Sequence, residues 1–150
     1  NAIRKSGLYK FYQIIPDSMQ RQIKNIIHSY KSYDVVDSKK VWHSILKNAK
    51  EYNCSIKKGN LDIEIYESAY FDWDNTPRYK NKGKIFCNIG EKELECNLRE
   101  LNEIVGERKQ DYLFFNAWNE WSESAYLEPD KKRGHKYLGI IKRVMKLNSK

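Results

Sequence analysis

A helical stripe that leads directly into a short apolar run is the feature that most constrains the fold of this chain. Between Glu91 and Arg108, apolar residues recur at spacings of four, three and four, as on one face of a helix. These residues are Leu94, Leu98, Leu101 and Val105. The run from Tyr112 to Phe115 is apolar throughout, which is typical of a strand buried on both faces of a parallel sheet, although a short buried helix would look the same. Helix, connection and strand in succession predict an α/β protein.

An acidic loop begins where the predicted strand ends. Residues 113–130 read LFFNAWNEWSESAYLEPD, and the glutamates among them are Glu120, Glu123 and Glu128. Proteins of the α/β class build their sites in the loops that follow the carboxyl ends of strands. We therefore expect the functional site of the chain in this loop.

The residue types in the loop suit carbohydrate chemistry. If the chain turns helically after the strand, Glu120 and Glu123 fall on one face, a few ångströms apart. Repulsion between such neighbours raises one carboxyl pKa and leaves the other low, which supplies an acid and a base at neutral pH. Trp118 and Trp121 suit the apolar faces of sugar rings, whose hydroxyl groups bond to carboxylates and amides. The alternative is that the tryptophans belong to the core and the glutamates are solvated.

Apolar periodicity and turn residues predict the remaining elements. Helices are expected from Asp17 or Ser18 to Lys31, from Asp37 or Ser38 through Ala49, and after Asp130. The residues expected to face inward in the last helix are Tyr137, Leu138, Ile141, Val144 and Met145. Extended segments are expected at 33–36 and 61–66, with a turn at 57–60 between the second helix and the second of these segments.

A second polar segment, residues 70–78, combines aromatic residues with Asp72 and Asp74. Pro77 disfavours helix for the residue before it, so the sequence Asn-Thr-Pro predicts a turn. The residues alone predict a turn stabilised by aspartate side chains, with one surface ion pair made by Arg78. Asp-Trp-Asp also matches the letters of the DxD metal motif of nucleotide-sugar transferases, but three residues make a weak pattern.

The net charge of +8 does not predict nucleic-acid binding. Residues 1–58 carry 12 Lys and Arg against 4 Asp and Glu, residues 59–130 carry 8 against 16, and residues 131–150 carry 8 against none. A phosphate-binding surface would gather basic and aromatic residues on one face, whereas the motif here is acidic. The basic last helix would also suit an anionic membrane surface, but a closing helix of an α/β domain is the preferred interpretation.

Cysteines and histidines give no sign of a metal site. Cys54, Cys87 and Cys96 are too far apart for a CxxC pair, and we expect buried free thiols in a reducing cytoplasm. His28 and His43 each lack a second ligand at helical spacing. No stretch reaches the roughly 20 apolar residues that span a bilayer.

Two blocks of the sequence resemble a known family. FDWDNTPRYKNKG and FFNAWNEWSESAYLEPDKKRGHKYL look like the signature blocks of the WbsX-like glycosyltransferase family, which is related to glycoside hydrolase family 99, and YDVVDSKKVW resembles the region upstream. The resemblance covers residues 30–145. It implies a (β/α)₈ TIM barrel, of which residues 1–150 would be a single-domain, incomplete C-terminal part, because a complete barrel takes about 250 residues. A first residue that is Asn1 rather than Met fits this expectation of a fragment.

The resemblance also implies roles for individual residues. Glu120 would activate the 2-hydroxyl group of the sugar, and Glu123 would serve as general acid and then as base. The residues implied to line the sugar site are Trp73, Asp74, Arg78, Asn119, Trp121 and Glu128. Neither a metal ion nor another cofactor is implied.

One position departs from the pattern of the family. Its members commonly carry Gly after the second glutamate, where this chain carries Ser124. If the position requires a positive φ, the serine costs about 1 kcal/mol and could shift Glu123.

Motifs and resemblance together predict a carbohydrate-active enzyme of bacterial surface polysaccharide (O-antigen or capsule) biosynthesis, either a glycosyltransferase or an enzyme like a glycoside hydrolase. The expected partner is a carbohydrate or glycan, with a nucleotide sugar as an alternative donor, no nucleic acid, and peripheral membrane contact left open. The expected location is the cytoplasm. The alternative is a non-catalytic carbohydrate-binding remnant of such an enzyme.

Overall fold

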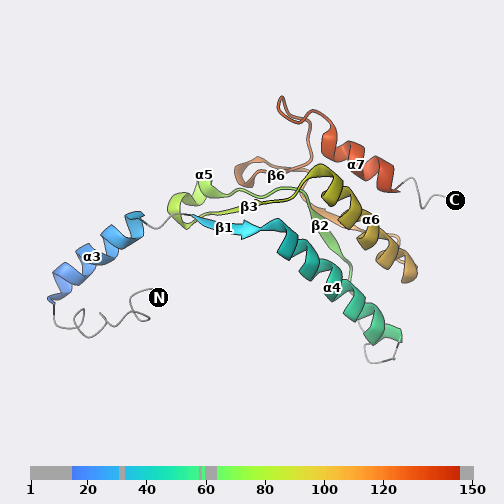
Figure 1. The fold of residues 1–150 in the computed structure, drawn as a ribbon, viewed down its shortest axis with the longest axis horizontal. Coiled ribbons are helices and arrows are strands. Elements are labelled where there is room, and N and C mark those ends of the chain that lie inside the picture. The colour runs from blue at the N-terminus through green and yellow to red at the C-terminus, as the bar shows by residue number, and fades with distance from the viewer. Residues whose placement is uncertain (1–14, 31–32, 58, 60–63, 146–150) are drawn as a thin grey trace.

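The structure is a computed structural model that describes residues 15–30, 33–57, 59 and 64–145. The helices of this part are α3 (Asp17–Tyr30), α4 (Ser38–Lys57), α5 (Thr76–Tyr79), α6 (Glu91–Glu107) and α7 (Lys136–Met145), with short 3₁₀ helices η1 (Lys80–Lys82) and η2 (Trp121–Glu123). The strands are β1 (Asp34–Asp37), β2 (Ser68–Tyr70), β3 (Lys84–Cys87), β4 (Phe114–Asn116), β5 (Asn119–Glu120) and β6 (Ala125–Tyr126). Figure 1 shows α3 at one end of the molecule and α4, α6 and α7 at the other.

The predicted helices are confirmed, although α4 continues past Ala49 to Lys57 and α7 begins only at Lys136. Asp37 caps α4, because its carboxylate accepts a hydrogen bond from the backbone N–H of Lys39 at 3.1 Å. His43 is exposed on α4, whereas the side chain of His28 lies outside the described residues. In α7 the residues predicted to face inward did not include Ile140, which is buried together with Val144.

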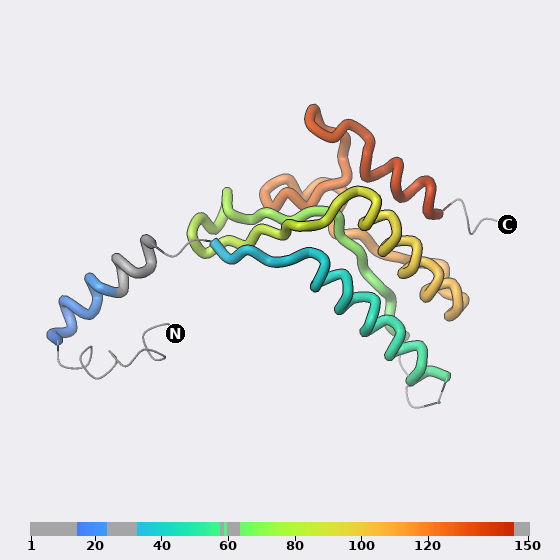
Figure 2. The backbone as a smooth tube through the Cα atoms, in the orientation of Figure 1, coloured from blue at the N-terminus to red at the C-terminus, as the bar shows by residue number. Residues whose placement is uncertain are grey.

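The predicted parallel pairing of strands is also confirmed. β1 pairs with β3 in parallel, and β2 pairs with β4 in parallel. Figure 2 shows β1 and β3 side by side, each leading into a long helix, α4 or α6, that leaves in the same direction. The chain is therefore a mixed α/β protein, and within the described residues its strands form two-stranded sheets rather than a closed barrel.

The burial expected for the strand at 112–115 is wrong. The strand there is β4, and the side chains of Tyr112 and Phe114 are 63% and 56% exposed. Among the described strands β4 pairs with β2, and one of its faces meets the core, where the ring of Phe115 lies 6.0 Å from that of Phe71. On the other face, Tyr66 meets Tyr112 and Phe114 edge to face. In this chain the unbroken apolar run therefore forms a strand, β4, with one face packed on the core and one aromatic face turned to solvent.

The strand expected at 61–66 is wrong for the part that is described. Residues 64–66 have no regular structure, residues 61–63 lie outside the described part, and the strand begins later, at Ser68. Side chains supply hydrogen bonds to the backbone of Ile65: its N–H donates to the Tyr52 hydroxyl at 3.0 Å, and its carbonyl accepts from the Gln110 amide at 2.9 Å. Of the turn expected at 57–60, Gly59 lies in a turn with a φ of 69°, Lys57 ends α4, and the other two residues lie outside the described part.

The core lies where α4, α6 and α7 pack against the strands. Its largest fully buried apolar side chains are Trp42, Leu98, Leu101, Ile140 and Val144. Trp42 of α4 stacks on Tyr70 of β2 with ring centroids 5.7 Å apart, so the two elements are packed directly together. Burial of each such side chain contributes about 1.5–3 kcal/mol, so this core fixes the strand ends from which the site loops leave.

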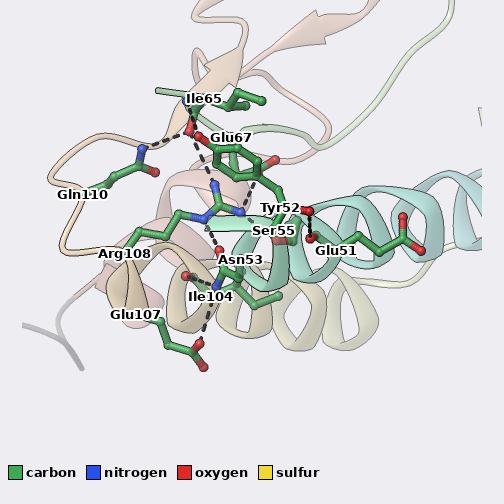
Figure 3. A network of polar contacts seen from close by, with 11 residues as sticks. Glu51, Tyr52, Asn53, Ser55, Ile65, Glu67, Ile104, Glu107, Arg108 and Gln110 are labelled. Atoms are coloured by element: carbon green, nitrogen blue, oxygen red, sulfur yellow. Dashed lines mark hydrogen bonds and ion pairs between the residues drawn. The ribbon is translucent and has the colours of Figure 1, made fainter. Parts of the chain in front are cut away.

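Arg108 joins the ends of α4 and α6 to the segment that precedes β2 (Figure 3). Its side chain is only 4% exposed and forms an ion pair with Glu67 at 2.8 Å. The guanidinium also donates to the backbone carbonyl of Ala49 at 2.7 Å and to the side-chain oxygen of Asn53, and it lies 4.5 Å from the ring of Tyr52. One guanidinium at the end of α6 therefore satisfies acceptors from both α4 and the segment before β2.

The expectation of buried cysteines is wrong for two of the three thiols. Cys54 and Cys96 are exposed, Cys87 is half-buried, and all three are free. Among the described residues, no helix has both the length and the apolar character needed to cross a membrane.

Candidate functional site

The first part of the site follows β2. The carbonyl of Trp73 accepts a hydrogen bond from the backbone N–H of Phe86 at 2.8 Å, and the two rings lie 6.0 Å apart. The carboxylate of Asp74 accepts from the backbone N–H of Thr76 at 2.9 Å and from its hydroxyl at 2.6 Å. Asp74 therefore stabilises the turn that opens α5, as residue chemistry alone predicted.

A close backbone approach keeps this turn in place. A Cβ atom added at Gly83 would lie 2.7 Å from the Cα atom of Thr76, so no side chain fits there. The amide of Lys84 also donates to the side-chain oxygen of Asn75 at 2.6 Å. The start of β3 is thereby held directly against α5.

The second part of the site is a tight antiparallel hairpin of β5, η2 and β6. Asn119 faces Tyr126 and Glu120 faces Ala125 across the hairpin. At its tip Ser124 has a φ of 51° and a ψ of 17°, the left-handed conformation, and its N–H donates to the carbonyl of Trp121 at 3.2 Å. The position of Ser124 therefore has the positive φ that was considered from the sequence, and the serine is strained at a position that suits glycine.

The two parts meet at Glu123. The backbone N–H of Asp74 donates to the carbonyl of Glu123 at 2.8 Å, and a guanidinium nitrogen of Arg78 lies 3.8 Å from its carboxylate. The side chain of Glu123 is 15% exposed, whereas that of Arg78 is 58% exposed. The ion pair predicted for Arg78 thus exists, but its partner comes from the hairpin.

Glu120 and Glu123 flank the same short turn but have different partners. Glu120 ends β5, and its carboxylate accepts a close hydrogen bond from the hydroxyl of Ser122. The turn between them is a 3₁₀ helix, in place of the α-helical turn considered from the sequence. One glutamate therefore has a neutral partner and the other a cationic one.

The tryptophans of the hairpin lie on the surface. Trp118 and Trp121 are 55% and 49% exposed, so the alternative that they belong to the core is wrong. The ring of Trp121 stacks on Tyr126 with centroids 3.8 Å apart, and its indole N–H donates to the carboxylate of Glu128 at 2.6 Å. An indole held in this way offers a flat apolar surface next to carboxylates.

The sequence profile described as "Glycosyltransferase WbsX" matches residues 3–141. The chain belongs to the WbsX glycosyltransferase family. It also matches proteins named "Uncharacterized protein WxcX" from two strains of Xanthomonas campestris pv. campestris, each 31% identical over 87 residues. The match covers 56% of this chain and 12% of those proteins, so the chain spans only a small part of the length of the curated relatives. No solved structure matches the chain significantly.

In this WbsX-family chain, the predicted site residues lie in or directly after the hairpin and in the segment from Trp73 to α5, and Trp73 also lines a pocket. A shallow pocket of about 290 Å³ opens beside Trp73 and Asn116. Its other lining residues are Ile45, Ser68, Ala69, Tyr70 and Phe86. Asn119 is exposed on the hairpin, and Glu128 is half-buried beside Trp121. Trp73 is the one predicted site residue among those that line this pocket.

Sequence reasoning missed the charged cluster that supports the hairpin of this family member. Arg133 lies against Asp72 and 3.7 Å from Asp130, and the hydroxyl of Tyr126 donates to Asp130 at 2.7 Å. Burial raises the pKa of the Asp72 carboxyl, and the guanidinium of Arg133 opposes that rise. Asp130 and Arg133 both lie in the quoted block, three residues apart, but nothing in the spacing of residues marks Asp72 as the other partner of Arg133.

The two aspartates of the Asp-Trp-Asp pattern are each bound by another residue of the chain. Asp72 binds Arg133, whereas Asp74 binds Thr76, so the two carboxylates serve different neighbours. In the part of the WbsX-family chain that the structure describes, no group of three or more His, Cys, Asp or Glu side chains comes together to hold a metal ion.

Proposed function

We propose that this chain carries the carbohydrate site of an enzyme that builds bacterial surface polysaccharide, such as O-antigen or capsule. Membership of a glycosyltransferase family supports a sugar substrate. The observation that carries the proposal is the junction at Glu123, where Asp74 and Arg78 of one motif contact the hairpin that holds Glu120 and Trp121. Carboxylates beside an exposed, fixed indole are what recognition and acid/base chemistry on a sugar require.

The proposed chemistry follows the relation to glycoside hydrolase family 99 that the resemblance of the sequence blocks implies. Glu120 takes the proton of the sugar 2-hydroxyl as this oxygen displaces the leaving group at C1, and Glu123 gives a proton to the departing oxygen. Glu123 then takes a proton from the incoming water or acceptor hydroxyl, whose oxygen bonds to C1 as the C1–O2 bond breaks and Glu120 returns its proton to O2. Arg78, 3.8 Å from Glu123, offsets negative charge at this glutamate. Trp73, Asp74, Asn119, Trp121 and Glu128 complete the proposed sugar site, and the chemistry needs neither a metal nor another cofactor.

We place the chain as one domain, the C-terminal part of a (β/α)₈ barrel. Two parallel strand pairs and the helices that follow β1 and β3 support this architecture. Both site segments also follow the carboxyl ends of parallel strands, β2 and β4, as in barrel enzymes. We place the protein in the cytoplasm, since exposed free thiols fit a reducing compartment.

A second candidate is a non-catalytic carbohydrate-binding module. The observation in its favour is that Trp118 and Trp121 are exposed, which serves binding without turnover equally well. The test is to express the longest polypeptide that the reading frame encodes and to assay it with α-mannosides and with nucleotide sugars, beside Glu120→Gln and Glu123→Gln. Turnover that depends on both glutamates supports the enzyme, and sugar binding without turnover supports the module.

A further inference from the structure

We propose that Arg133, which lies outside every predicted site position, is a positioning residue that holds the Trp121–Tyr126 aromatic pair in register with the segment that carries Trp73. The inference rests on the proposed function in so far as the aligned surface binds a sugar. The alignment itself is a statement about the fold and is tested separately below.

Arg133 bridges the two motif segments. One of its guanidinium nitrogens contacts the carboxylate of Asp72, the residue directly before Trp73. The other lies 3.7 Å from Asp130, the last residue of the acidic loop. Its side chain is 21% exposed, and the guanidinium carbon lies 5.1 Å and 5.7 Å from the rings of Tyr137 and Tyr126. A planar, permanently charged fork can reach both carboxylates while lying over an aromatic ring, which an ammonium group cannot do.

The contacts continue from Arg133 to the exposed indole. Asp130 accepts hydrogen bonds from the hydroxyl of Tyr126 at 2.7 Å and from the backbone N–H groups of Lys132, at 2.7 Å, and Arg133. The ring of Tyr126 lies 3.8 Å from that of Trp121 with an angle of 14° between their planes. Tyr126 is therefore fixed at its hydroxyl by Asp130 and at its ring by Arg133, and it is the surface on which Trp121 rests.

Arg133 also has a plain structural effect that must be separated from positioning. Asp72 is partly buried, so removal of Arg133 leaves a carboxylate without its cation and destabilises the fold. The double variant Asp72→Asn, Arg133→Met removes that penalty while still leaving Tyr126 without the guanidinium. Arg133→Lys keeps the charge but loses the fork.

The direct readout is the indole ¹⁵N–¹H spectrum of the chain, which has four tryptophans. The Trp121 signal, assigned with Trp121→Phe, reports the bond to Glu128 and the ring of Tyr126, and the Trp42 signal reports the core. In Arg133→Met and in the double variant we expect the Trp121 signal to shift and to exchange faster with water, with Trp42 unchanged. Arg133→Lys should shift it less, and Lys132→Met, an exposed neighbour whose contact to Asp130 is made by its backbone, should leave it in place.

Two results would overturn the inference: a Trp121 signal that stays in place in a folded Arg133→Met chain, or one that returns to its wild-type position in the double variant. If the single variant does not fold, the double variant decides.

Kinetics of the longest encoded polypeptide add a second readout, with an α-mannoside that it turns over. We expect KM of the double variant to rise about tenfold, the effect of losing one well-placed aromatic contact, with kcat within about twofold of wild type. A fall in kcat with unchanged KM would contradict a role in aligning the sugar surface. A wild-type protein that turns over no sugar would defeat the proposed function, while the indole spectrum would still decide the role of Arg133.

Discussion

The backbone N–H of Asp74 donates a hydrogen bond to the backbone carbonyl of Glu123 at 2.8 Å. These residues belong to the two motifs of the chain, and the bond is made between main-chain atoms, so among substitutions only Asp74→Pro, which eliminates the N–H, removes it directly. The contact places Glu123 at a fixed point beside α5, where Arg78 reaches its carboxylate. The hydrogen bond between the two backbones thus holds the two motifs side by side.

Ser124→Gly should raise the free energy of unfolding by about 1 kcal/mol, because glycine adopts the left-handed conformation at φ 51° without strain. Urea denaturation of the two chains measures the difference. Ser124→Ala is the matched variant, since it keeps the Cβ atom and should give no stabilisation. An equal gain from alanine and glycine would show that strain at φ is not the cause.

Gly83→Ala should destabilise the fold by about 1–3 kcal/mol, because its Cβ atom would meet the backbone of Thr76 at 2.7 Å. Gly106→Ala is the control: it lies inside α6 with open space around it and should stabilise the chain by about 0.5–1 kcal/mol. Thermal unfolding of both variants gives the comparison. A neutral Gly83→Ala would mean that β3 is free to move away from α5.

Arg108→Met should cost about 3–5 kcal/mol, because Glu67, 14% exposed, and the acceptors around Arg108 would lose their partner. Arg99, which pairs with Glu95 one turn away in α6 and is 35% exposed, is the control, and Arg99→Met should cost less than about 1 kcal/mol. Denaturant titration distinguishes the two. Equal costs would contradict the central place given to Arg108 in joining α4, α6 and the segment before β2.

Stability should fall in alkaline solution through Tyr137. Burial raises the pKa of its hydroxyl from 10.0 to about 12. The unfolded chain therefore releases this proton first, so stability declines as the pH rises from 10 and levels off above 12. In Tyr137→Phe this part of the decline should be absent, as unfolding midpoints measured from pH 9 upward would show. Parallel curves for the two chains would refute the assignment.

The long helices could be predicted from the sequence because their apolar residues repeat over many turns, as Leu94, Leu98 and Leu101 do in α6. The exposure of Phe114 could not be predicted from the sequence, because the burial of a strand face depends on which elements cover it. Of the site, the turn at Asp74 follows from local chemistry, whereas the strain at Ser124 could be considered only because the family commonly carries Gly at that position. The contacts that long cationic side chains make with distant segments could not be predicted from the sequence.

The pairing of Arg78 with Glu123 shows the limit most clearly. Two aspartates stand nearer to Arg78 in the sequence, yet each is taken by another partner, Asp72 by Arg133 and Asp74 by Thr76. Such choices depend on the approach of distant segments, which residue spacing does not encode. Arg133 was missed for the same reason.

The most direct test of the central claim is the turnover of α-mannosides and the transfer of sugar from nucleotide sugars by the longest encoded polypeptide, with Glu120→Gln and Glu123→Gln beside Glu103→Gln, an exposed glutamate of α6. We expect each site variant to lose at least about 100-fold in kcat while it stays folded, as removal of a general acid or base does, and Glu103→Gln to retain wild-type activity. Sugar transfer that survives both Glu120→Gln and Glu123→Gln would contradict the acid/base pair.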